Sequence, residues 1–204
     1  MKMNKEILII ANGNSIINYK FSNFINDFST IGRINNFQIK NYEKHIGTKT
    51  DIWFHGANQG VKPRKNIPKN IIVLVPSKVL DKKKEHIYTI IKKRQNLDLN
   101  HYSLIDLNTI KKYENLLSLE RLTTGTKAIL WAMENYRKVI IHGFDFFTVS
   151  KNHYFDSKIK KWLYNNFYTL AKKHNVKKEM NYINNQIHNK KLFLLKDLID
   201  QKFL

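Results

Sequence analysis

The chain has 204 residues, 42% of them hydrophobic, which suffices for one well-buried core and is too little for two ordinary domains. Lys and Arg total 36 against 16 Asp and Glu, and the formal net charge of +20 predicts an anionic partner: nucleic acid, an anionic membrane surface, or a phosphorylated or acidic substrate. The absence of cysteine excludes disulfides, thiolate metal sites and a cysteine nucleophile.

Residues 7–10 form an apolar run that is too short for a signal peptide, and no stretch reaches the roughly 18 consecutive apolar residues of a membrane span. We therefore expect a cytoplasmic protein made of a single domain over residues 1–204. A reducing compartment agrees with the absence of cysteine.

Short apolar runs rich in Ile, Val and Phe recur along the chain, at residues 7–11, 28–34, 52–55, 71–75, 139–142 and 192–195. Several of them are typical of buried strands. Segments with helical spacing of apolar residues lie between them, at 128–136 and 159–170, and residues 62–68 hold two of the three prolines and predict a loop. The alternation predicts an α/β fold, a single Rossmann-like domain whose mostly parallel sheet carries helices on both faces.

The first predicted strand runs directly into Asn12, Gly13, Asn14 and Ser15. In an open parallel sheet, ligands bind beyond the carboxyl ends of the strands, where such a turn offers free backbone amides to an anion. Gly13 tolerates unusual backbone angles, and Asn14 or Ser15 can cap a following helix. An ordinary Asn-Gly turn is the alternative interpretation.

A second candidate anion site begins at Arg121, where Thr123, Thr124 and Gly125 precede a predicted helix over residues 127–137. Thr123 or Thr124 is a natural N-cap, and a helix N-terminus beside hydroxyls and an arginine favours a phosphate or carboxylate. The alternative is a helix that is capped and nothing more.

The strand that follows this helix ends in Gly143-Phe144-Asp145-Phe146-Phe147, and a loop segment Asn152-His153-Tyr154-Phe155-Asp156 comes soon after. These two segments and four others resemble the bacterial sialyltransferases of glycosyltransferase family 42 and the wider sialyltransferase-like group. The others are Asn12-Gly13-Asn14-Ser15, Arg33-Ile34-Asn35-Asn36-Phe37, Arg121-Leu122-Thr123-Thr124-Gly125, and His174 with Glu179. The resemblance spans residues 6 to about 195. It implies an inverting enzyme that moves a nonulosonic acid from a CMP-sugar onto a glycan hydroxyl.

The resemblance also implies roles for single residues. His174 is expected to be the general base, a task that suits an imidazole with a pKa near neutrality. His153 stands where the family has one of two tyrosines on the leaving phosphate, and Phe147 replaces the other. His153 or its neighbour Tyr154 is expected to donate a hydrogen bond to that phosphate. The residues expected to bind the donor are Asn12, Gly13, Ser15, Asn35, Arg121, Thr123, Thr124, Gly125, Asp145 and Tyr154.

No Asp-x-Asp pair occurs in the sequence, so neither a metal nor a cofactor besides the CMP-sugar donor is expected. The expected acceptor is a glycan or glycolipid of surface polysaccharide or lipooligosaccharide synthesis, reached through a peripheral contact with the anionic inner face of the membrane. CMP-Kdo and CMP-linked pseudaminic or legionaminic acid stay open as donors, and a basic nucleic-acid-binding module stays open as a different class. The oligomeric state is open as well.

Overall fold

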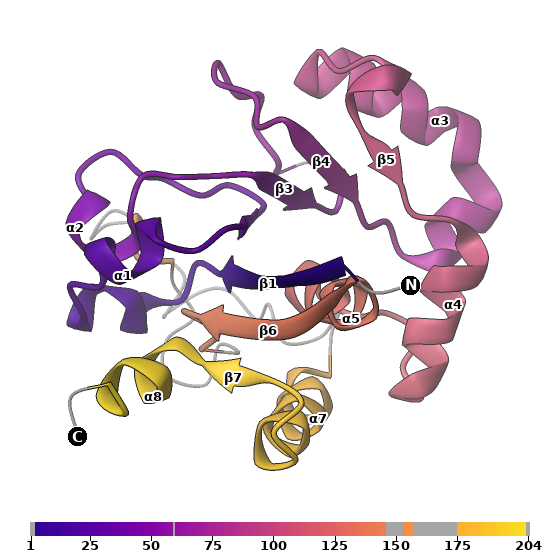
Figure 1. The fold of residues 1–204 in the computed structure, drawn as a ribbon. Coiled ribbons are helices and arrows are strands. Elements are labelled where there is room, and N and C mark those ends of the chain that lie inside the picture. The colour runs from indigo at the N-terminus through magenta and orange to yellow at the C-terminus, as the bar shows by residue number, and fades with distance from the viewer. Residues whose placement is uncertain (1–2, 59, 146–152, 157–174, 203–204) are drawn as a thin grey trace.

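The computed structural model describes residues 3–58, 60–145, 153–156 and 175–202, and its centre is a seven-stranded, entirely parallel sheet (Figure 1). The strand order is β5-β4-β3-β2-β1-β6-β7. The strands are β1 (Met3–Ile10), β2 (Ile31–Ile34), β3 (Ile52–His55), β4 (Asn70–Val73), β5 (Ser103–Leu104), β6 (Tyr136–His142) and β7 (Phe193–Leu194).

Both faces of the sheet are covered by helices, as the sequence predicts. Residues of β1 alternate between the two cores, with Ile7 and Ile9 in one and Leu8 and Ile10 in the other. Each isoleucine fully removed from water stabilises the fold by roughly 1.5–3 kcal/mol, so a strand buried on both faces is a strong determinant of the architecture. The α/β, Rossmann-like fold class is confirmed.

The helices that form the larger core come from the connections between strands. They are α3 (Ser77–Gln95), α4 (Leu107–Leu116), α5 (Thr124–Asn135) and α7 (Val176–His188). The opposite core is closed by α1 (Ser22–Asn26), α2 (Glu43–Ile46) and α8 (Leu195–Asp200). Figure 1 shows α1, α2 and α8 on one side of the molecule and α3 and α4 on the other. Within the described residues no helix combines the length and the apolar character that crossing a membrane requires.

Each of the six predicted apolar runs overlaps a strand, and residues 62–68 form a loop as expected. Several boundaries differ from the prediction, among them the start of β1, which lies at Met3. Only the last four residues of run 28–34 are extended, α5 begins at Thr124, and β6 begins at Tyr136. The strand β5 was not predicted, because its two residues are partly exposed at the sheet edge and show no apolar run. The predicted helix at 159–170 lies outside the described residues.

Arg33 is a fully buried cation in the middle of β2. Its guanidinium holds the chain segment that leads into β3: it donates to the carbonyl oxygens of Ile46 at 2.7 Å and Lys49 at 3.0 Å, and to the Thr50 hydroxyl at 2.9 Å. Burial lowers the pKa of Arg33 to about 10, while Tyr154 opposes that shift. The side chain therefore remains charged at neutral pH and fixes the loop between α2 and β3.

Lys127 is a second buried cation, on the inner face of α5, and is 1% exposed. Its ammonium donates to the Leu74 carbonyl oxygen just beyond β4, at 2.5 Å. Burial lowers the pKa of Lys127 to about 7, although Glu114 favours the charged form. Folding therefore disfavours protonation of this lysine.

This pKa shift predicts how stability depends on pH. Between about pH 7 and pH 10 the unfolded chain holds a proton on Lys127 that the folded chain releases. The contribution of Lys127 to the free energy of unfolding therefore rises with pH. Relative to Lys127→Met, the wild-type free energy of unfolding should gain about 1.4 kcal/mol per pH unit between about pH 7.5 and pH 9. Chemical denaturation at several pH values measures this difference. Lys93→Met, at an exposed position of α3, is the control. If the difference in unfolding free energy between wild type and Lys127→Met did not change with pH, the lowered pKa of Lys127 would be contradicted.

Candidate functional site

The order of the strands marks one position along the sheet as special. Strands β1 to β5 follow one another in one direction, whereas β6 and β7 lie on the other side of β1. The carboxyl ends of β1 and β6 therefore flank the point at which the order reverses, and ligands of open parallel sheets bind at such a point. The loops after these two strands carry Asn12, Gly13, Ser15 and Asp145.

These two loops touch through their backbones. The Ala11 amide donates to the His142 carbonyl at 2.9 Å, and the Gly13 amide donates to the Gly143 carbonyl at 2.9 Å. A Cβ on Gly13 would lie 2.4 Å from Asp145 Cγ and 2.5 Å from the Gly143 oxygen. Gly143 itself has a φ of 71°, in the region that favours glycine. Close approach of the two strands thus requires glycine at both positions.

Asp145 joins the same two loops through its side chain. Its Oδ2 accepts from the Ser15 amide at 2.9 Å, and its Oδ1 accepts from the Ser15 hydroxyl. The expectation that Asn14 or Ser15 caps a helix is wrong, because the 3-10 helix η1 (Asn14–Asn18) begins after Gly13 and has no side-chain cap. The Ser15 hydroxyl instead donates to the carboxylate of Asp145, which is distant in sequence, and so it does not cap η1.

The segment 153–156 packs against the β1 loop. His153 forms an antiparallel bridge with Gly13, and the Tyr154 amide donates to the Asn12 carbonyl at 3.2 Å. The Tyr154 hydroxyl donates to the Gln38 carbonyl at 2.6 Å and accepts from the Gln38 amide at 3.0 Å. Burial raises the pKa of Tyr154 to about 12. Tyr154 therefore anchors this segment, and of the two neighbours His153 is the one that lies directly beside Gly13.

Asn12 and Asn35 lie at the ends of neighbouring strands. Asn12 is 7% exposed; its Nδ2 donates to the Ile34 carbonyl at 2.9 Å, while its Oδ1 is buried without a hydrogen-bond partner among the described residues. Asn35 adopts a φ of 48°, and its Oδ1 accepts from the Gly56 amide at 3.3 Å. The structure thus brings the two asparagines predicted from sequence to adjacent strand ends.

The N-terminus of α5 reaches the same edge of the sheet. Gly125 lies close to two strand ends, because a Cβ there would be 3.1 Å from the Phe144 ring and 3.7 Å from Ile34 Cδ1. The Thr124 hydroxyl oxygen lies 2.8 Å from the position of a Cβ on Gly56. Arg121 is exposed where the chain enters the helix. Thr124 and Gly125 therefore border the region beyond β2, β3 and β6.

Thr123 caps α5, as predicted, since its hydroxyl accepts from the Thr126 amide at 3.2 Å. A carboxylate from the protein already occupies this position. Glu179 of α7 is 0% exposed and accepts from the Thr123 amide at 3.1 Å, from the Thr123 hydroxyl at 2.7 Å and from the Thr126 hydroxyl. Glu179 thus ties the first turn of α7 to the first turn of α5, and its contacts engage Thr123 and Thr126 but not Thr124 or Gly125.

Buried polar atoms without a hydrogen-bond partner among the described residues gather on these central strands and on the loops that follow them. Besides Gln95 on α3, they belong to Asn12 Oδ1, Arg33 Nη1, His55 Nε2, Arg64 Nε and His142 Nε2. Burial lowers the pKa of His142 to about 4, against the opposing effect of Asp145, and burial lowers that of His55 to about 3. Both imidazoles are therefore neutral near pH 7. The site residues expected from the sequence include Asn12 but not Arg33, His55, Arg64 or His142, although an arginine inside an apolar run was a detectable signal at Arg33.

Two residues expected at the site, His174 and Phe147, lie outside the described residues. The described chain resumes at Asn175, whose side chain caps α7 by accepting from the Lys178 amide at 3.1 Å. In the sequence His174 stands one residue before this cap. Its role as a base stays a prediction.

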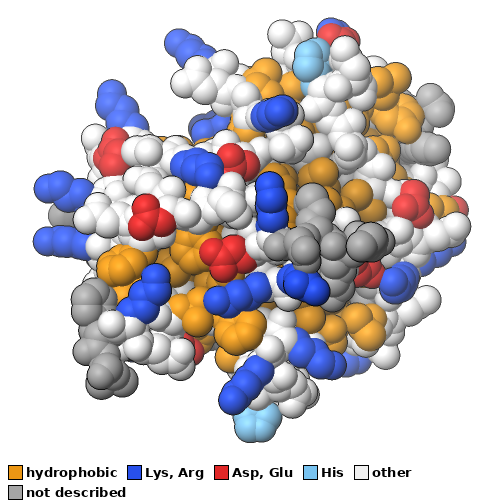
Figure 2. All heavy atoms as spheres, in the orientation of Figure 1, with side chains coloured by type: hydrophobic (Ala, Val, Ile, Leu, Met, Phe, Trp, Pro, Cys, Tyr) orange, Lys and Arg blue, Asp and Glu red, His pale blue; other side chains and the backbone are white. Residues whose placement is uncertain are grey.

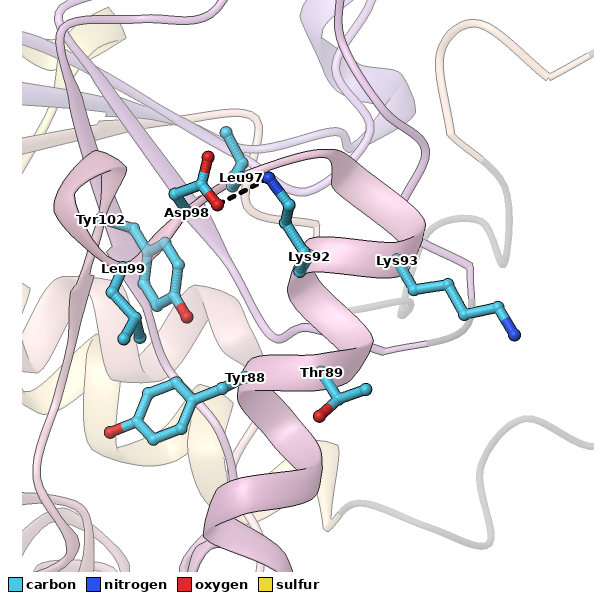
Figure 3. Close-up of a pocket in the computed structure, with 8 residues that line it drawn as sticks. All are labelled: Tyr88, Thr89, Lys92, Lys93, Leu97, Asp98, Leu99 and Tyr102. Atoms are coloured by element: carbon cyan, nitrogen blue, oxygen red, sulfur yellow. Dashed lines mark ion pairs between the residues drawn. The ribbon is translucent and has the colours of Figure 1, made fainter.

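A pocket of about 420 Å³ lies elsewhere, between the end of α3 and the 3-10 helix η2 (Leu99–His101) that precedes β5. Figure 3 shows Tyr88, Leu99 and Tyr102 around it and the ion pair between Lys92 and Asp98, whose nitrogen and oxygen are 2.6 Å apart. This pocket is at the amino end of β5 and shares none of the residues described above. In the described ranges of the chain, no group of three or more His, Asp or Glu residues could hold a metal ion.

Comparison with known proteins agrees with this topology. A family model described as glycosyltransferase family 29 (sialyltransferase) matches residues 4–192. The sialyltransferase type expected from the sequence is thereby confirmed, but the matching model is that of family 29 and not of family 42. A comparison with curated protein sequences yields no match.

Solved sialyltransferases share the fold. A mammalian sialyltransferase is 12% identical with a TM-score of 0.71, covering 95% of this chain and 69% of its own. A mammalian sialyltransferase in complex with Gal-beta-1-3GalNAc-ortho-nitrophenol is 13% identical with a TM-score of 0.70, covering 95% and 70%. The sialyltransferase CstII from Campylobacter jejuni, in complex with the substrate analogue CMP-3FNeuAc, is 18% identical with a TM-score of 0.61, covering 94% and 81%.

The contact at Gly13 predicts a specific sensitivity to side-chain volume. Gly13→Ala should lower the free energy of unfolding by about 1–3 kcal/mol, because the methyl group collides with Asp145 and the Gly143 carbonyl. Denaturant titration measures the loss. Gly60→Ala is the matched control, since the nearest atom to its Cβ would be Asn58 Oδ1 at 3.4 Å, and equal behaviour of the two variants would contradict the assigned contact.

The Glu179 clamp predicts a second loss of stability. Glu179→Gln keeps the shape but replaces an oxygen that accepts from hydroxyl groups with a nitrogen that donates, so the free energy of unfolding should fall by about 1–3 kcal/mol. Glu120→Gln removes an equal charge from an exposed ion pair with Lys78 and should change the unfolding midpoint little. Equal, small effects of both substitutions would show that the Glu179 carboxylate does not join α7 to α5.

Proposed function

Because this chain belongs to glycosyltransferase family 29, the sialyltransferase family, we propose that it transfers a nonulosonic acid from a CMP-sugar to a glycan hydroxyl. The observation that carries the proposal is the family match across residues 4–192, which includes β1, β6 and the site between them. Solved proteins of the same fold that hold CMP-3FNeuAc or Gal-beta-1-3GalNAc-ortho-nitrophenol support a CMP-sugar donor and a glycan acceptor.

The donor would lie across the carboxyl ends of β1, β2 and β6. Asn12 Oδ1, which is buried without a hydrogen-bond partner among the described residues, would accept a hydrogen bond from a nucleotide hydroxyl or amino group. Thr124 and Gly125 would face the carboxylate of the donor sugar at the positive end of the α5 dipole, with Arg121 adding charge. Gly13, Ser15 and Asp145 would shape the site by holding the two loops together.

The proposed reaction is a single displacement with inversion. The acceptor oxygen bonds to the anomeric carbon while the bond from that carbon to the phosphate oxygen breaks, and CMP departs with the electron pair. His174 would take the proton of the acceptor hydroxyl, a contribution of roughly a hundred- to ten-thousand-fold in rate. His153, beside Gly13, would donate a hydrogen bond to the leaving phosphate. The proposal includes no metal and no further cofactor.

The finer details of substrate are proposals as well. CMP-Kdo and CMP-linked pseudaminic or legionaminic acid also carry a carboxylate on a CMP-linked sugar and suit the same contacts. A site arranged as in the bacterial enzymes of family 42 is supported by the motifs around Asn12, Asn35 and Arg121. We further propose work on surface polysaccharide or lipooligosaccharide at the inner face of the membrane, supported by the net charge of +20 and by the Lys and Arg side chains spread over the face in Figure 2.

Ligand binding and transfer test this function separately. CMP at a hundred times its dissociation constant should stabilise the protein by about 2.7 kcal/mol and raise the melting temperature by roughly 5–10 °C, whereas UDP should not. Asn12→Ala should lose most of the CMP shift, and Asn184→Ala, on the exposed side of α7, should retain it. An equal shift by UDP, or an unchanged CMP shift in Asn12→Ala, would contradict the proposed donor site.

In the same preparations, His174→Ala should keep the CMP shift and lose about a hundred- to ten-thousand-fold of transfer from CMP-sialic acid to a galactoside. Transfer by the wild type should persist in a chelator. Near-wild-type transfer by His174→Ala would refute the proposed base.

A further inference from the structure

The loop between β3 and β4 has an unusual composition. Residues 52–80 contain no Asp or Glu, whereas the loop itself carries Lys62, Arg64, Lys65 and Lys69. The three lysines are exposed, and none of them forms an ion pair with a carboxylate in the described part of the chain. The loop therefore presents concentrated and unneutralised positive charge.

An apolar side chain stands among these lysines. Ile67 is 45% exposed, and Pro63 and Pro68 restrict the backbone on either side of it. Figure 1 shows the stretch that leads into β4 projecting from the rest of the ribbon. An isoleucine exposed between lysines contributes no burial energy to the fold. It can, however, enter the headgroup region of a bilayer while the ammonium groups meet lipid phosphates.

The base of the loop is firmly attached beside the candidate site. The Lys62 amide donates to Asn36 Oδ1 at 2.9 Å, and Arg64 donates to the Phe37 carbonyl at 3.1 Å. The Arg64 guanidinium also lies on the Phe37 ring, 3.5 Å from its centroid, and Val61 is 4% exposed. Because Asn36 directly follows Asn35, whatever the loop binds is held at a defined position relative to the ends of β2 and β3.

We propose that residues 62–69 form a docking surface for an anionic bilayer, with Lys62, Lys65 and Lys69 at the lipid headgroups and Ile67 at the level of the glycerol groups. A nucleic acid would also be attracted by the charge, but residues 57–70 contain no aromatic side chain on which bases could stack. Docking does not depend on the transfer reaction. Docking at this loop would also turn the candidate site towards a lipid-linked acceptor, and that consequence rests on the proposed function.

Charge reversal with a matched control tests the surface. Each lysine near an anionic surface strengthens partitioning about fivefold, so Lys62→Glu, Lys65→Glu and Lys69→Glu together should weaken sedimentation with phosphatidylglycerol-containing vesicles at least on the order of 100-fold. Lys93→Glu, Lys177→Glu and Lys191→Glu together change the net charge equally and should retain most of the binding. An equal loss in both triple variants, or equal binding to pure phosphatidylcholine, would overturn the proposal.

Insertion of Ile67 is tested with a fluorophore. Since the chain has no cysteine, Ile67→Cys creates a single labelling position. The control is Leu99→Cys, at a 63% exposed leucine of the pocket that Lys92 and Lys93 also line (Figure 3). An environment-sensitive label at 67, but not at 99, should shift to the blue with anionic vesicles. A label at 67 that stays in water, or a loop that binds RNA while the protein ignores vesicles, would overturn the proposal. Both tests measure binding, so loss of transfer activity leaves them unaffected.

Discussion

The contact between the loops that follow β1 and β6 is the constraint on which the rest of the site depends. Two backbones approach until the Gly13 amide bonds the Gly143 carbonyl, and no Cβ fits between them. This contact brings Asp145 within reach of Ser15 and lets the segment 153–156 bridge to Gly13. A backbone platform therefore forms at the switch point of the sheet, and the side chains that would meet a ligand surround it.

The charged groups around this platform are held in place by the protein itself. The carboxylates nearby are bound to the protein itself: Asp145 to Ser15, Glu179 to Thr123 and Thr126, and Glu114 to Ser77. Arg33 remains as a buried cation, His55 and His142 remain as neutral imidazoles, and Lys127 is a buried amine whose protonation is disfavoured by folding. Because such groups are already removed from water and held in place, they need little rearrangement to stabilise negative charge. This arrangement agrees with a donor that carries both a phosphate and a carboxylate.

Much of the sheet could be predicted from the sequence, because strands buried on both faces appear as apolar runs, and Thr123 could be recognised as a cap from its local context. The two-residue edge strand β5 carries no such run. The partners of Ser15 and Glu179 lie far away in sequence, so neither the Asp145 contact nor the clamp between α7 and α5 could be derived from spacing. Lys127 is indistinguishable in sequence from a solvated lysine, since only the position of β4 shows that it is buried.

The position of β1 in the centre of the sheet has a consequence for synthesis on the ribosome. One edge of β1 finds its partner β2 soon after it leaves the exit tunnel, but the other edge must wait until Tyr136–His142 has been translated. During that interval a strand whose second half, residues 7–10, is wholly apolar has an open edge, a condition that favours association with other nascent chains. The glycine contact at the switch point thus cannot form until Gly143 has been translated, and the site exists only once most of the chain has been made.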